Sequence, residues 1–157
     1  MSANANASKS GPPETPRATV DVIIEMPGGI VLVRRRHPPP GWALPGGFVD
    51  LGESVPHAAV REALEETALH VELIALLGVY SEPGRDPRGD TASVVYVASA
   101  AGDPCAQDDA KMVRVVGLAD LPADLAFDHA QVLADYRRYR ERGELPPPSR
   151  GLPPRRA

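Results

Sequence analysis

The residues best suited to chemistry in this 157-residue chain are four glutamates and one arginine that follow a glycine at fixed intervals. In chain order they are Gly47, Glu53, Arg61, Glu62, Glu65 and Glu66. Five residues separate the glycine from the first glutamate, seven separate that glutamate from the Arg-Glu pair, and two separate this pair from the last two glutamates. Carboxylates gathered in this way are suited to hard divalent cations, which prefer oxygen ligands.

The local sequence predicts a helix over residues 55–68 that would carry most of these groups. Ser54 is suited to the N-cap position, and Pro56 is tolerated in a first turn, where backbone N–H groups lack intrahelical partners. We expect an apolar stripe facing the protein, formed by Ala59, Val60, Ala63, Leu64 and Thr67. The three glutamates at 62, 65 and 66 stand three and four residues apart, so we expect them to share one exposed face.

Three like charges at this spacing repel one another, so the pattern predicts a compensating cation. Mg²⁺ is usually held by a few carboxylates, waters and substrate phosphates. Arg61 can hold a carboxylate bidentately, and together with Glu53 it is expected to orient the metal ligands. An isolated E-x-x-E-E would be an ordinary solvated helix face. Its register with Gly47, Glu53 and Arg61 favours a metal site instead.

This spacing resembles the signature of the Nudix hydrolases, G-x5-E-x7-R-E-U-x-E-E-x-G-U, in which U is a bulky aliphatic residue. Two positions depart from it, because Ala68 replaces the last glycine and the small Ala63 replaces the first aliphatic residue. Glycine is preferred after a helix because it takes positive φ readily. Ala68 therefore predicts a slightly different helix end or an extension to His70. Neither change removes a candidate metal ligand.

Composition narrows the class of protein. The length fits one domain with one good core. A net charge of −4 and a pI near 5.5 argue against a general nucleic-acid binder. The single cysteine, Cys105, excludes an intrachain disulfide and fits a reducing compartment. We find no apolar run of membrane-spanning length and no signal-peptide core, so we expect a cytoplasmic protein without membrane contact.

The remaining pattern predicts a domain at residues 17–145 between a mobile tail at 1–16 and a Pro/Arg-rich tail at 146–157. We expect strands at residues 18–26, 30–36, 71–81, 91–100 and 112–116. The first two form a hairpin, and residues 41–47 lead into the motif. A second helix at 129–142 presents Val132, Leu133, Tyr136 and Tyr139. Strands enclosed by two helices predict an α/β/α sandwich, and the Nudix resemblance implies the same fold with a mixed central sheet.

A segment at residues 81–89 bears on substrate binding. It carries Arg85 and Arg88 between prolines, which makes it a candidate preorganised anion clamp. The alternative is a surface turn in which Arg85 pairs with Asp86. The string S-x-P-x-R-D-P-R-G is similar to one common in the ADP-ribose pyrophosphatases of the Nudix superfamily, and residues 44–49 and 126–129 resemble that subgroup too. Asp90 departs from the bulky or basic residue often found there.

Three further residues are candidates for the site. The resemblance implies that a carboxylate near Asp109 approaches the metal from a loop, as a fourth ligand or as the general base. Glu82 is a second candidate base, and a solvated acidic loop is the alternative for both. Trp42 is a candidate for stacking on a base or ribose, although a lone Trp before Pro-Gly-Gly more often packs. The histidines form no metal-ligand pair at helical spacing, which argues against zinc.

The resemblance implies hydrolysis of a diphosphate linkage, with Mg²⁺ or Mn²⁺ on Glu62, Glu65 and Glu66 and on the Gly46 carbonyl. Arg85 or Arg88 would hold the distal ribose phosphate, and ADP-ribose would give AMP and ribose 5-phosphate. A homodimer is plausible because many relatives bind substrate across one. A nucleoside-triphosphate pyrophosphatase is the second enzyme hypothesis. A nucleotide-sugar sensor is disfavoured by the intact glutamates and the lack of a winged-helix segment, and a scaffold would not need the glutamates.

Overall fold

A seven-stranded sheet forms the middle layer, in the order β3-β2-β1-β6-β5 with β4 beside β1 and β7 beside β2. The structure is a computed structural model that describes residues 13–148 and 150–152. Its strands are β1 (Arg17–Met26), β2 (Gly29–Arg35), β3 (Trp42–Ala43), β4 (Gly46–Phe48), β5 (Val71–Tyr80), β6 (Thr91–Ala100) and β7 (Ala110–Val116). Its helices are α1 (Val55–Thr67) and α2 (His129–Arg142).

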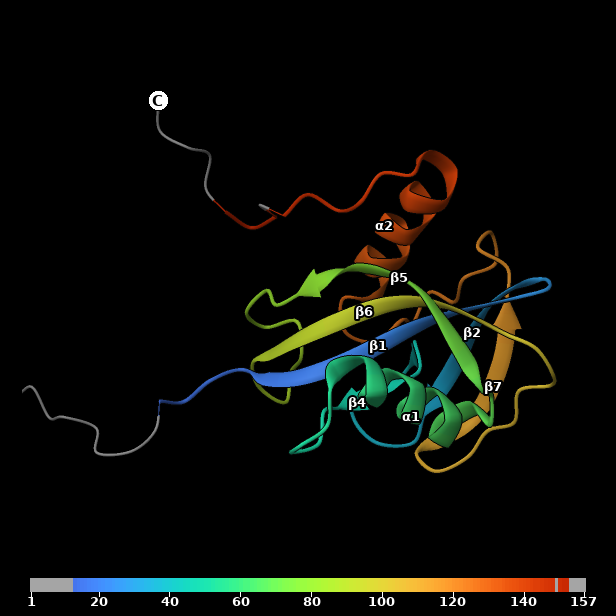
Figure 1. Ribbon diagram of the computed structural model, residues 1–157, viewed down its shortest axis with the longest axis horizontal. Helices are drawn as coiled ribbons and strands as arrows, with labels where there is room; N and C mark the ends of the chain where they lie inside the picture. The colour runs from blue at the N-terminus through green and yellow to red at the C-terminus, as the bar shows by residue number, and fades with distance from the viewer. Residues whose placement is uncertain (1–12, 149, 153–157) are drawn as a thin grey trace, which may run out of the picture.

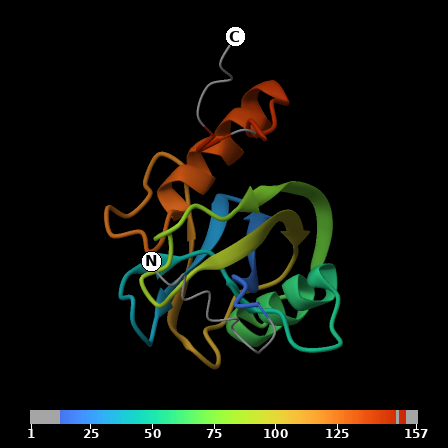
Figure 2. The same ribbon diagram turned by 90° about the vertical axis from the view of Figure 1, so that its left-hand side faces the viewer.

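The two helices cover opposite faces of the sheet (Figures 1 and 2). The strands β1 and β6 run parallel over nine registered pairs, and all the other strand pairs are antiparallel. The β1–β2 hairpin forms as expected, with Glu25 opposite Ile30. The prediction of an α/β/α sandwich with a mixed central sheet is therefore confirmed.

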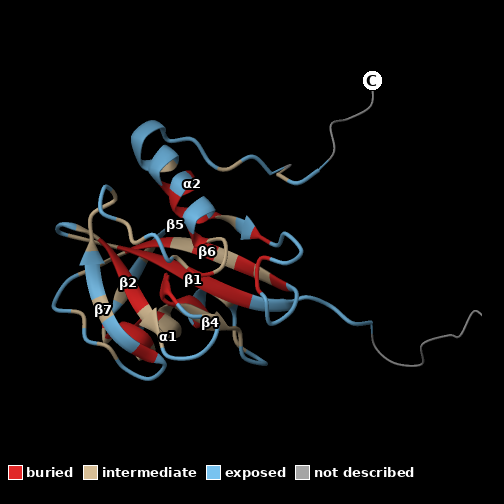
Figure 3. Cartoon of the chain, turned by 180° about the vertical axis from the view of Figure 1, so that it is seen from behind, coloured by how far each residue is buried: buried red, intermediate tan, exposed pale blue. Residues whose placement is uncertain are grey.

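The side chains of β1 point alternately to the two faces of the sheet, so they contribute to two separate core clusters. Val20, Val22 and Ile24 pack in the cluster that includes the alanines of α1, whereas Ile23 packs in the cluster that includes Val132 of α2. Successive strand residues point to opposite faces, so a strand buried on both sides reads as a nearly continuous apolar run. Figure 3 shows this burial along β1 and β2. Asp21 interrupts the run and lines a cleft instead.

Helix α1 is rotated relative to the expected stripe. Its buried residues are Ala58, Ala59, Ala63, Glu66 and Thr67. The prediction was wrong for Val60, which is half-buried, and for Leu64, which is 36% exposed. Small alanine side chains let a helix approach a sheet closely, and the face that carries them is the one that packs. This rotation turns Leu64 toward solvent and Glu66 toward the interior.

Both ends of α1 follow local chemistry. The Ser54 side chain caps the first turn by accepting a hydrogen bond from the His57 N–H at 3.4 Å. Ala68 takes the left-handed conformation with a φ of 59°, and its N–H donates to the Leu64 carbonyl. The helix therefore ends at Thr67, and the alternative of an extension to His70 is wrong. Alanine occupies a conformation that glycine would adopt with less strain.

The segments outside the sandwich are only partly described. The predicted tails at 1–16 and 146–157 fall largely on residues outside the described range, so the domain boundaries stay a prediction. Residues 13–16 are exposed without regular structure. Arg150 of the second tail is half-buried, and its guanidinium lies 2.7 Å from the Asp135 carboxylate on α2. In the described residues, neither helix has the length and apolar character needed to cross a membrane.

Replacing Leu133 by alanine is expected to lower the free energy of unfolding by about 2–5 kcal/mol, because it leaves a cavity in the core. Leu133 is 1% exposed between α2 and the sheet. The matched change Leu145→Ala alters a side chain that is 59% exposed, and it should cost less than about 0.5 kcal/mol. Urea denaturation followed by circular dichroism measures both variants. Equal losses would contradict this assignment of the core.

Candidate active site

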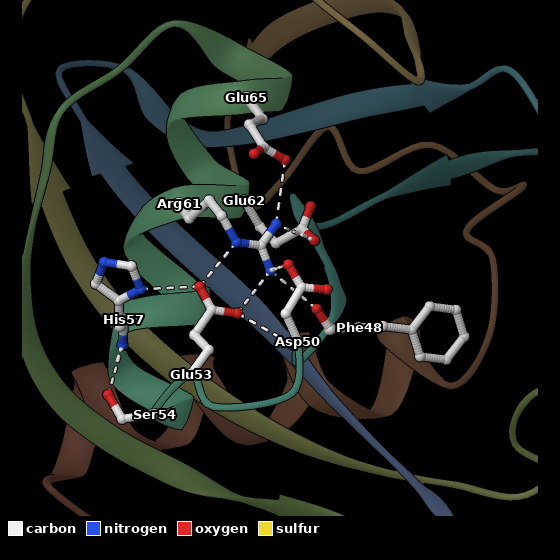
Figure 4. A network of polar contacts seen from close by, with 8 residues as sticks. All are labelled: Phe48, Asp50, Glu53, Ser54, His57, Arg61, Glu62 and Glu65. Carbon is white, nitrogen blue, oxygen red and sulfur yellow. Dashed lines mark hydrogen bonds and ion pairs between the residues drawn. The ribbon is translucent and has the colours of Figure 1, made fainter.

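The guanidinium of Arg61 connects α1 to the two segments that precede it (Figure 4). Its Nε and one terminal nitrogen donate to both oxygens of Glu53, each at 2.8 Å. The other terminal nitrogen donates to Glu62 at 2.9 Å and to Glu65 at 3.1 Å. A further hydrogen bond of 3.0 Å reaches the Phe48 carbonyl. The bidentate pairing of Arg61 with a carboxylate is present as the sequence predicted.

The electrostatics of Glu53 match this geometry. The hydrogen bonds from Arg61 lower the pKa of Glu53 to about 2, and the N–H of Asp50 and the ring of His57 add to the shift. The Glu53 side chain is 7% exposed, and it bonds to the Asp50 N–H and the His57 ring at 3.1 and 2.8 Å. Glu53 is therefore a permanently ionised anchor for Arg61 rather than a group that exchanges protons near neutral pH.

Two glycines before the helix leave room for the carboxylates. A Cβ on Gly47 would lie 2.3 Å from a carboxylate oxygen of Glu62, so any side chain there would displace that carboxylate. A Cβ on Gly46 would lie 2.1 Å from the Val20 carbonyl oxygen on β1. The Gly46 N–H donates to the Glu66 carboxylate at 3.1 Å. Because Gly46 and Gly47 have no side chains, the turn lies closer to the carboxylates and to β1 than it could with any other residues at these positions.

Glu62 and Glu66 lie in a low-dielectric cleft, so the expectation of a single exposed glutamate face is wrong. Glu66 is 9% exposed, and the Glu62 side chain is 14% exposed. Burial raises the pKa of Glu66 to about 8, and repulsion from Glu62 contributes. Burial likewise raises the pKa of Glu62. The cause of the error is the rotation of α1, which turns these two residues toward β4.

Glu65 differs from the other two glutamates. Its side chain is 44% exposed, it pairs with Arg61, and it does not line the cleft formed by the described residues. Within the described range, no three acidic, histidine or cysteine side chains lie close enough to form a metal site as they stand. Glu62 and Glu66 nevertheless fit a hard cation, because both are buried oxygen donors whose charge is disfavoured without one. The role of Glu65 as a ligand stays a prediction.

A cavity of about 420 Å³ is lined by Glu62 and Glu66 together with residues of β1, β2 and β4. Its acidic lining residues are Asp21, Asp50, Glu62, Glu66, Asp86 and Asp109. Its basic lining residues are Arg35, Arg36, His37, Arg85 and Arg88, and its aromatic ones are Phe48 and Phe127. The cleft therefore offers oxygen donors together with cations and aromatic rings, which suits a ligand that carries phosphate groups and a base.

Arg85 lines this cleft, but its charge is already engaged. Its side chain is 4% exposed and donates to both carboxylate oxygens of Asp128, at 2.9 and 2.6 Å. A third hydrogen bond of 2.9 Å goes to the Thr91 hydroxyl. The alternative in which Arg85 pairs with Asp86 is wrong, since Arg88 is the partner of Asp86. Arg85 holds the turn before α2, which leaves it little capacity to clamp an anion.

Arg88 is the more accessible of the two arginines. Its side chain is 37% exposed, and it donates to the Asp86 carboxylate at 3.0 and 2.8 Å. Its guanidinium also lies 5.4 Å from the Phe48 ring centroid and 5.3 Å from that of Phe127. These distances are in the range of cation–π attraction. Asp86 and the two rings thus hold Arg88 in place at the cleft.

The other predicted residues divide between the cleft and the rest of the protein. Asp109 lines the cleft at its rim, where its carboxylate lies 3.3 Å from His37 Nε2 and is 73% exposed. Trp42 is 8% exposed in the core, and it is absent from the cleft lining that the described residues form. Glu82 is absent from that lining too. The structure therefore supports neither Trp42 as a stacking platform nor Glu82 as the general base.

Sequence reasoning missed Asp21 and the two phenylalanines of the cleft. Asp21 lies on β1 opposite Gly46, and it accepts a short hydrogen bond from the Ser93 hydroxyl. A carboxylate in the middle of the apolar run Val20–Ile24 is the sequence signal that could have identified it. Phe127 has a positive φ of 55°, which no sequence pattern predicts.

The sheet, the glycine turn and the glutamate helix define a Nudix-type hydrolase site. The sequence model of the NUDIX domain matches residues 15–136, so the chain belongs to the Nudix family. It is 46% identical over 128 residues to an ADP-ribose pyrophosphatase from Methanocaldococcus jannaschii, a match that covers 80% of this chain and 75% of the relative.

Two solved structures of proteins similar to this chain contain bound ligands. The NUDIX domain of Shewanella oneidensis NrtR, complexed with ADP ribose, aligns with a TM-score of 0.69 at 30% identity, covering 83% of this chain and 90% of that one. A bifunctional NMN adenylyltransferase/ADP ribose pyrophosphatase from Francisella tularensis, complexed with AMP and a Mn ion, aligns with a TM-score of 0.68 at 30% identity. That alignment covers 83% of this chain and 43% of the bifunctional protein.

The raised pKa of Glu66 predicts how the metal-free protein responds to pH. The folded state keeps this proton up to about pH 8, whereas the unfolded chain releases it near pH ~4.3, so folding binds a proton between these values. Stability should therefore fall as pH rises from about 5 to about 8. Over this range the free energy of unfolding should fall less in Glu66→Gln than in the wild type. The difference should be at least ~1.4 kcal/mol, which is the value of one pKa unit.

Urea denaturation in EDTA across this pH range measures the difference between the wild type and Glu66→Gln. The matched control is Glu72→Gln, which removes an exposed carboxylate from β5 and should follow the wild-type profile. Parallel profiles for all three proteins would show that Glu66 is not a buried, proton-binding carboxyl.

Proposed function

We propose that this protein is a metal-dependent hydrolase that cleaves the diphosphate linkage of a nucleoside diphosphate derivative, with ADP-ribose as the substrate. The products would be AMP and ribose 5-phosphate. Water adds to one phosphorus, the bond from that phosphorus to the bridging oxygen breaks, and the leaving phosphate carries the bridging oxygen away. The 46% identity to the archaeal ADP-ribose pyrophosphatase supports this choice of substrate.

One observation carries the proposal: two buried carboxylates face the same cleft as a fixed arginine between aromatic rings. Glu62 and Glu66 lie against the glycine turn, and Arg88 lies between 5 and 6 Å from the centroids of Phe48 and Phe127. If a cation on Glu62 and Glu66 held the phosphates of a nucleotide, the rest of the nucleotide could extend toward Arg88 and the two phenylalanines. Aromatic rings and a guanidinium there can hold a base or a ribose phosphate.

Mg²⁺, or Mn²⁺ as in the Francisella structure, is the proposed cofactor. Glu62, Glu66 and the Gly46 carbonyl would hold it, with Glu65 and Asp109 as further candidate ligands. When bound, such an ion neutralises phosphate oxygens and lowers the pKa of a coordinated water. The chain itself supplies the fixed geometry: Arg61 orients Glu62, and the glycine turn sets the position of Glu66. The general base must come from the carboxylates that line the cleft.

We also propose that the protein forms a homodimer. The strand β5 lies at the edge of the sheet and pairs only with β6 in the described part of the chain. It exposes Ile74, Leu76 and Val79 to between 51% and 61%. Apolar side chains on an unpaired edge strand are typical of a surface that is covered by another chain.

Product analysis by chromatography tests the proposed reaction. We expect Mg²⁺ and the wild-type protein to convert ADP-ribose into AMP and ribose 5-phosphate. Glu66→Gln should reduce the rate by at least about 100-fold, because it removes a charged oxygen donor from the buried site. The panel also contains NADH, diadenosine polyphosphates and nucleoside triphosphates. Glu72→Gln is the matched control and should keep the wild-type rate.

The other outcomes of this panel select between alternatives. Pyrophosphate release from nucleoside triphosphates, without turnover of ADP-ribose, would make the protein a nucleotide-pool pyrophosphatase. Tight binding of ADP-ribose without turnover of any substrate would make it a sensor. Both results would overturn the proposed reaction, although the first would retain the buried carboxylates as the metal site.

The two arginines are expected to respond differently to substitution. Arg88→Ala should raise the KM for ADP-ribose about tenfold, which corresponds to the ~1.4 kcal/mol of one charged contact. It should also lower the free energy of unfolding by about 1–3 kcal/mol, because the Asp86 side chain, which is 2% exposed, loses its partner. Arg85→Ala should have the smaller effect on KM and should lower the free energy of unfolding by about 3 kcal/mol, because it leaves Asp128 without its partner. Steady-state kinetics and urea denaturation measure both effects, with the exposed Arg138→Ala as the control. A larger rise in KM for Arg85→Ala than for Arg88→Ala would show that Arg85 is the anion clamp.

A further inference from the structure

Three consecutive side chains at the start of α2 contact residues that line the cleft. Phe127 faces the guanidinium groups of Arg35 and Arg88, at 4.8 and 5.3 Å from its ring centroid. Asp128 receives two of the three hydrogen bonds of the Arg85 side chain, and it makes no side-chain capping bond to the helix. His129, the first residue of α2, is fully buried. The proposed reaction assigns no role to this histidine.

The ring of His129 is bound to the segment that leads into the glycine turn. Its Nδ1 accepts a hydrogen bond of 3.1 Å from the Leu44 N–H. A nitrogen that accepts carries no proton, so the neutral ring bears its proton on Nε2. Within the described residues, Nε2 has no hydrogen-bond partner, and Asp21 Oδ1 lies 3.3 Å away. The bond to Leu44 is therefore the one hydrogen bond of this ring in the described structure, and the Asp21 carboxylate is a second polar neighbour of the ring.

The segment from Leu44 to Gly46 is held at each of its three residues by a different element. The Val22 N–H on β1 donates to the Pro45 carbonyl at 2.8 Å. The Gly46 N–H donates to Glu66 on α1 at 3.1 Å. His129 supplies the third contact from α2, which covers the opposite face of the sheet from α1. These contacts restrain the backbone of the segment next to the proposed metal site, in addition to the pairing of Gly46 with Asp21 on β1.

We propose that His129 is a positioning residue, whose Nδ1 fixes the Leu44 peptide and thereby the Gly46 backbone at the metal site. This inference rests on the proposed function, because Gly46 is a ligand only if the site binds a cation. The alternative is a histidine that merely fills the core. A core role depends on the shape of the ring, whereas the positioning role depends on an acceptor at the place of Nδ1.

Two substitutions separate these roles. In His129→Asn, the side-chain oxygen can occupy the place of Nδ1 and accept the Leu44 N–H, although the rest of the ring is lost. In His129→Gln, the amide reaches the place of Nε2 instead, so the Leu44 N–H loses its acceptor. Calorimetric titration with Mn²⁺, in the absence of substrate, should show a dissociation constant raised about 10- to 100-fold in His129→Gln and unchanged in His129→Asn.

Kinetics with ADP-ribose at saturating Mn²⁺ should leave KM unchanged in both variants, because His129 does not line the cleft that the described residues form. Val132→Ala, three residues along α2 in the apolar core, controls for lost packing and should bind Mn²⁺ as the wild type does. All proteins are compared below the lowest unfolding temperature. If His129→Gln is unstable, His129→Leu takes its place, because leucine has nearly the shape of asparagine but offers no acceptor at the place of Nδ1.

Equal weakening of Mn²⁺ binding in both variants, or wild-type binding in both, would overturn the proposal. Weak binding in His129→Asn alone would also overturn it, because the contact near Asp21 would then be the important one. Failure of the proposed function is a separate result. In that case the wild type itself would not bind Mn²⁺ or would not cleave ADP-ribose, whatever the variants do.

Discussion

The bidentate ion pair between Arg61 and Glu53 is the interaction on which the geometry of the site depends. It ties α1 to the loop before it, and the same guanidinium also holds Glu62 and the Phe48 carbonyl. Charge-assisted bonds of this kind are short and directional, so together with the packing of the alanine face they fix the rotation of the helix. That rotation turns Glu62 and Glu66 toward the cleft and leaves Leu64 in solvent.

Close packing at the glycine turn completes this arrangement from the opposite side. Gly46 lies against the backbone of β1, and Gly47 lies against the carboxylate of Glu62. The ion pair fixes where the helix presents its carboxylates, and the glycines fix how closely the backbone approaches them. Neither feature is sufficient alone, because a side chain on Gly47 would displace a carboxylate that Arg61 holds in place.

Burial of these carboxylates explains how an acidic protein can act on phosphates. The raised pKa values of the two glutamates mean that ionising both of them costs free energy unless a cation is bound. A cation placed there also attracts phosphate oxygens. Two of the basic groups of the same cleft are already paired with carboxylates, Arg85 with Asp128 and Arg88 with Asp86. Such pairing keeps the arginines in fixed positions, and it lowers the net positive charge that they offer.

The sequence by itself determined the features that depend on local spacing. The N-cap at Ser54, the partnership of Arg61 with Glu53, both helices and the β1–β2 hairpin follow from contacts a few residues apart or from a turn. The mixed sandwich followed from the order of these elements and from the Nudix resemblance.

Only the tertiary structure decided which face of α1 is buried, which carboxylate Arg85 meets and where Trp42 lies. The partner of Arg85 is 43 residues away along the chain, and the bond from Leu44 to His129 spans 85 residues. Such contacts depend on strand register and on how α2 docks against the sheet. No local pattern encodes those distances, because they result from the packing of the whole core.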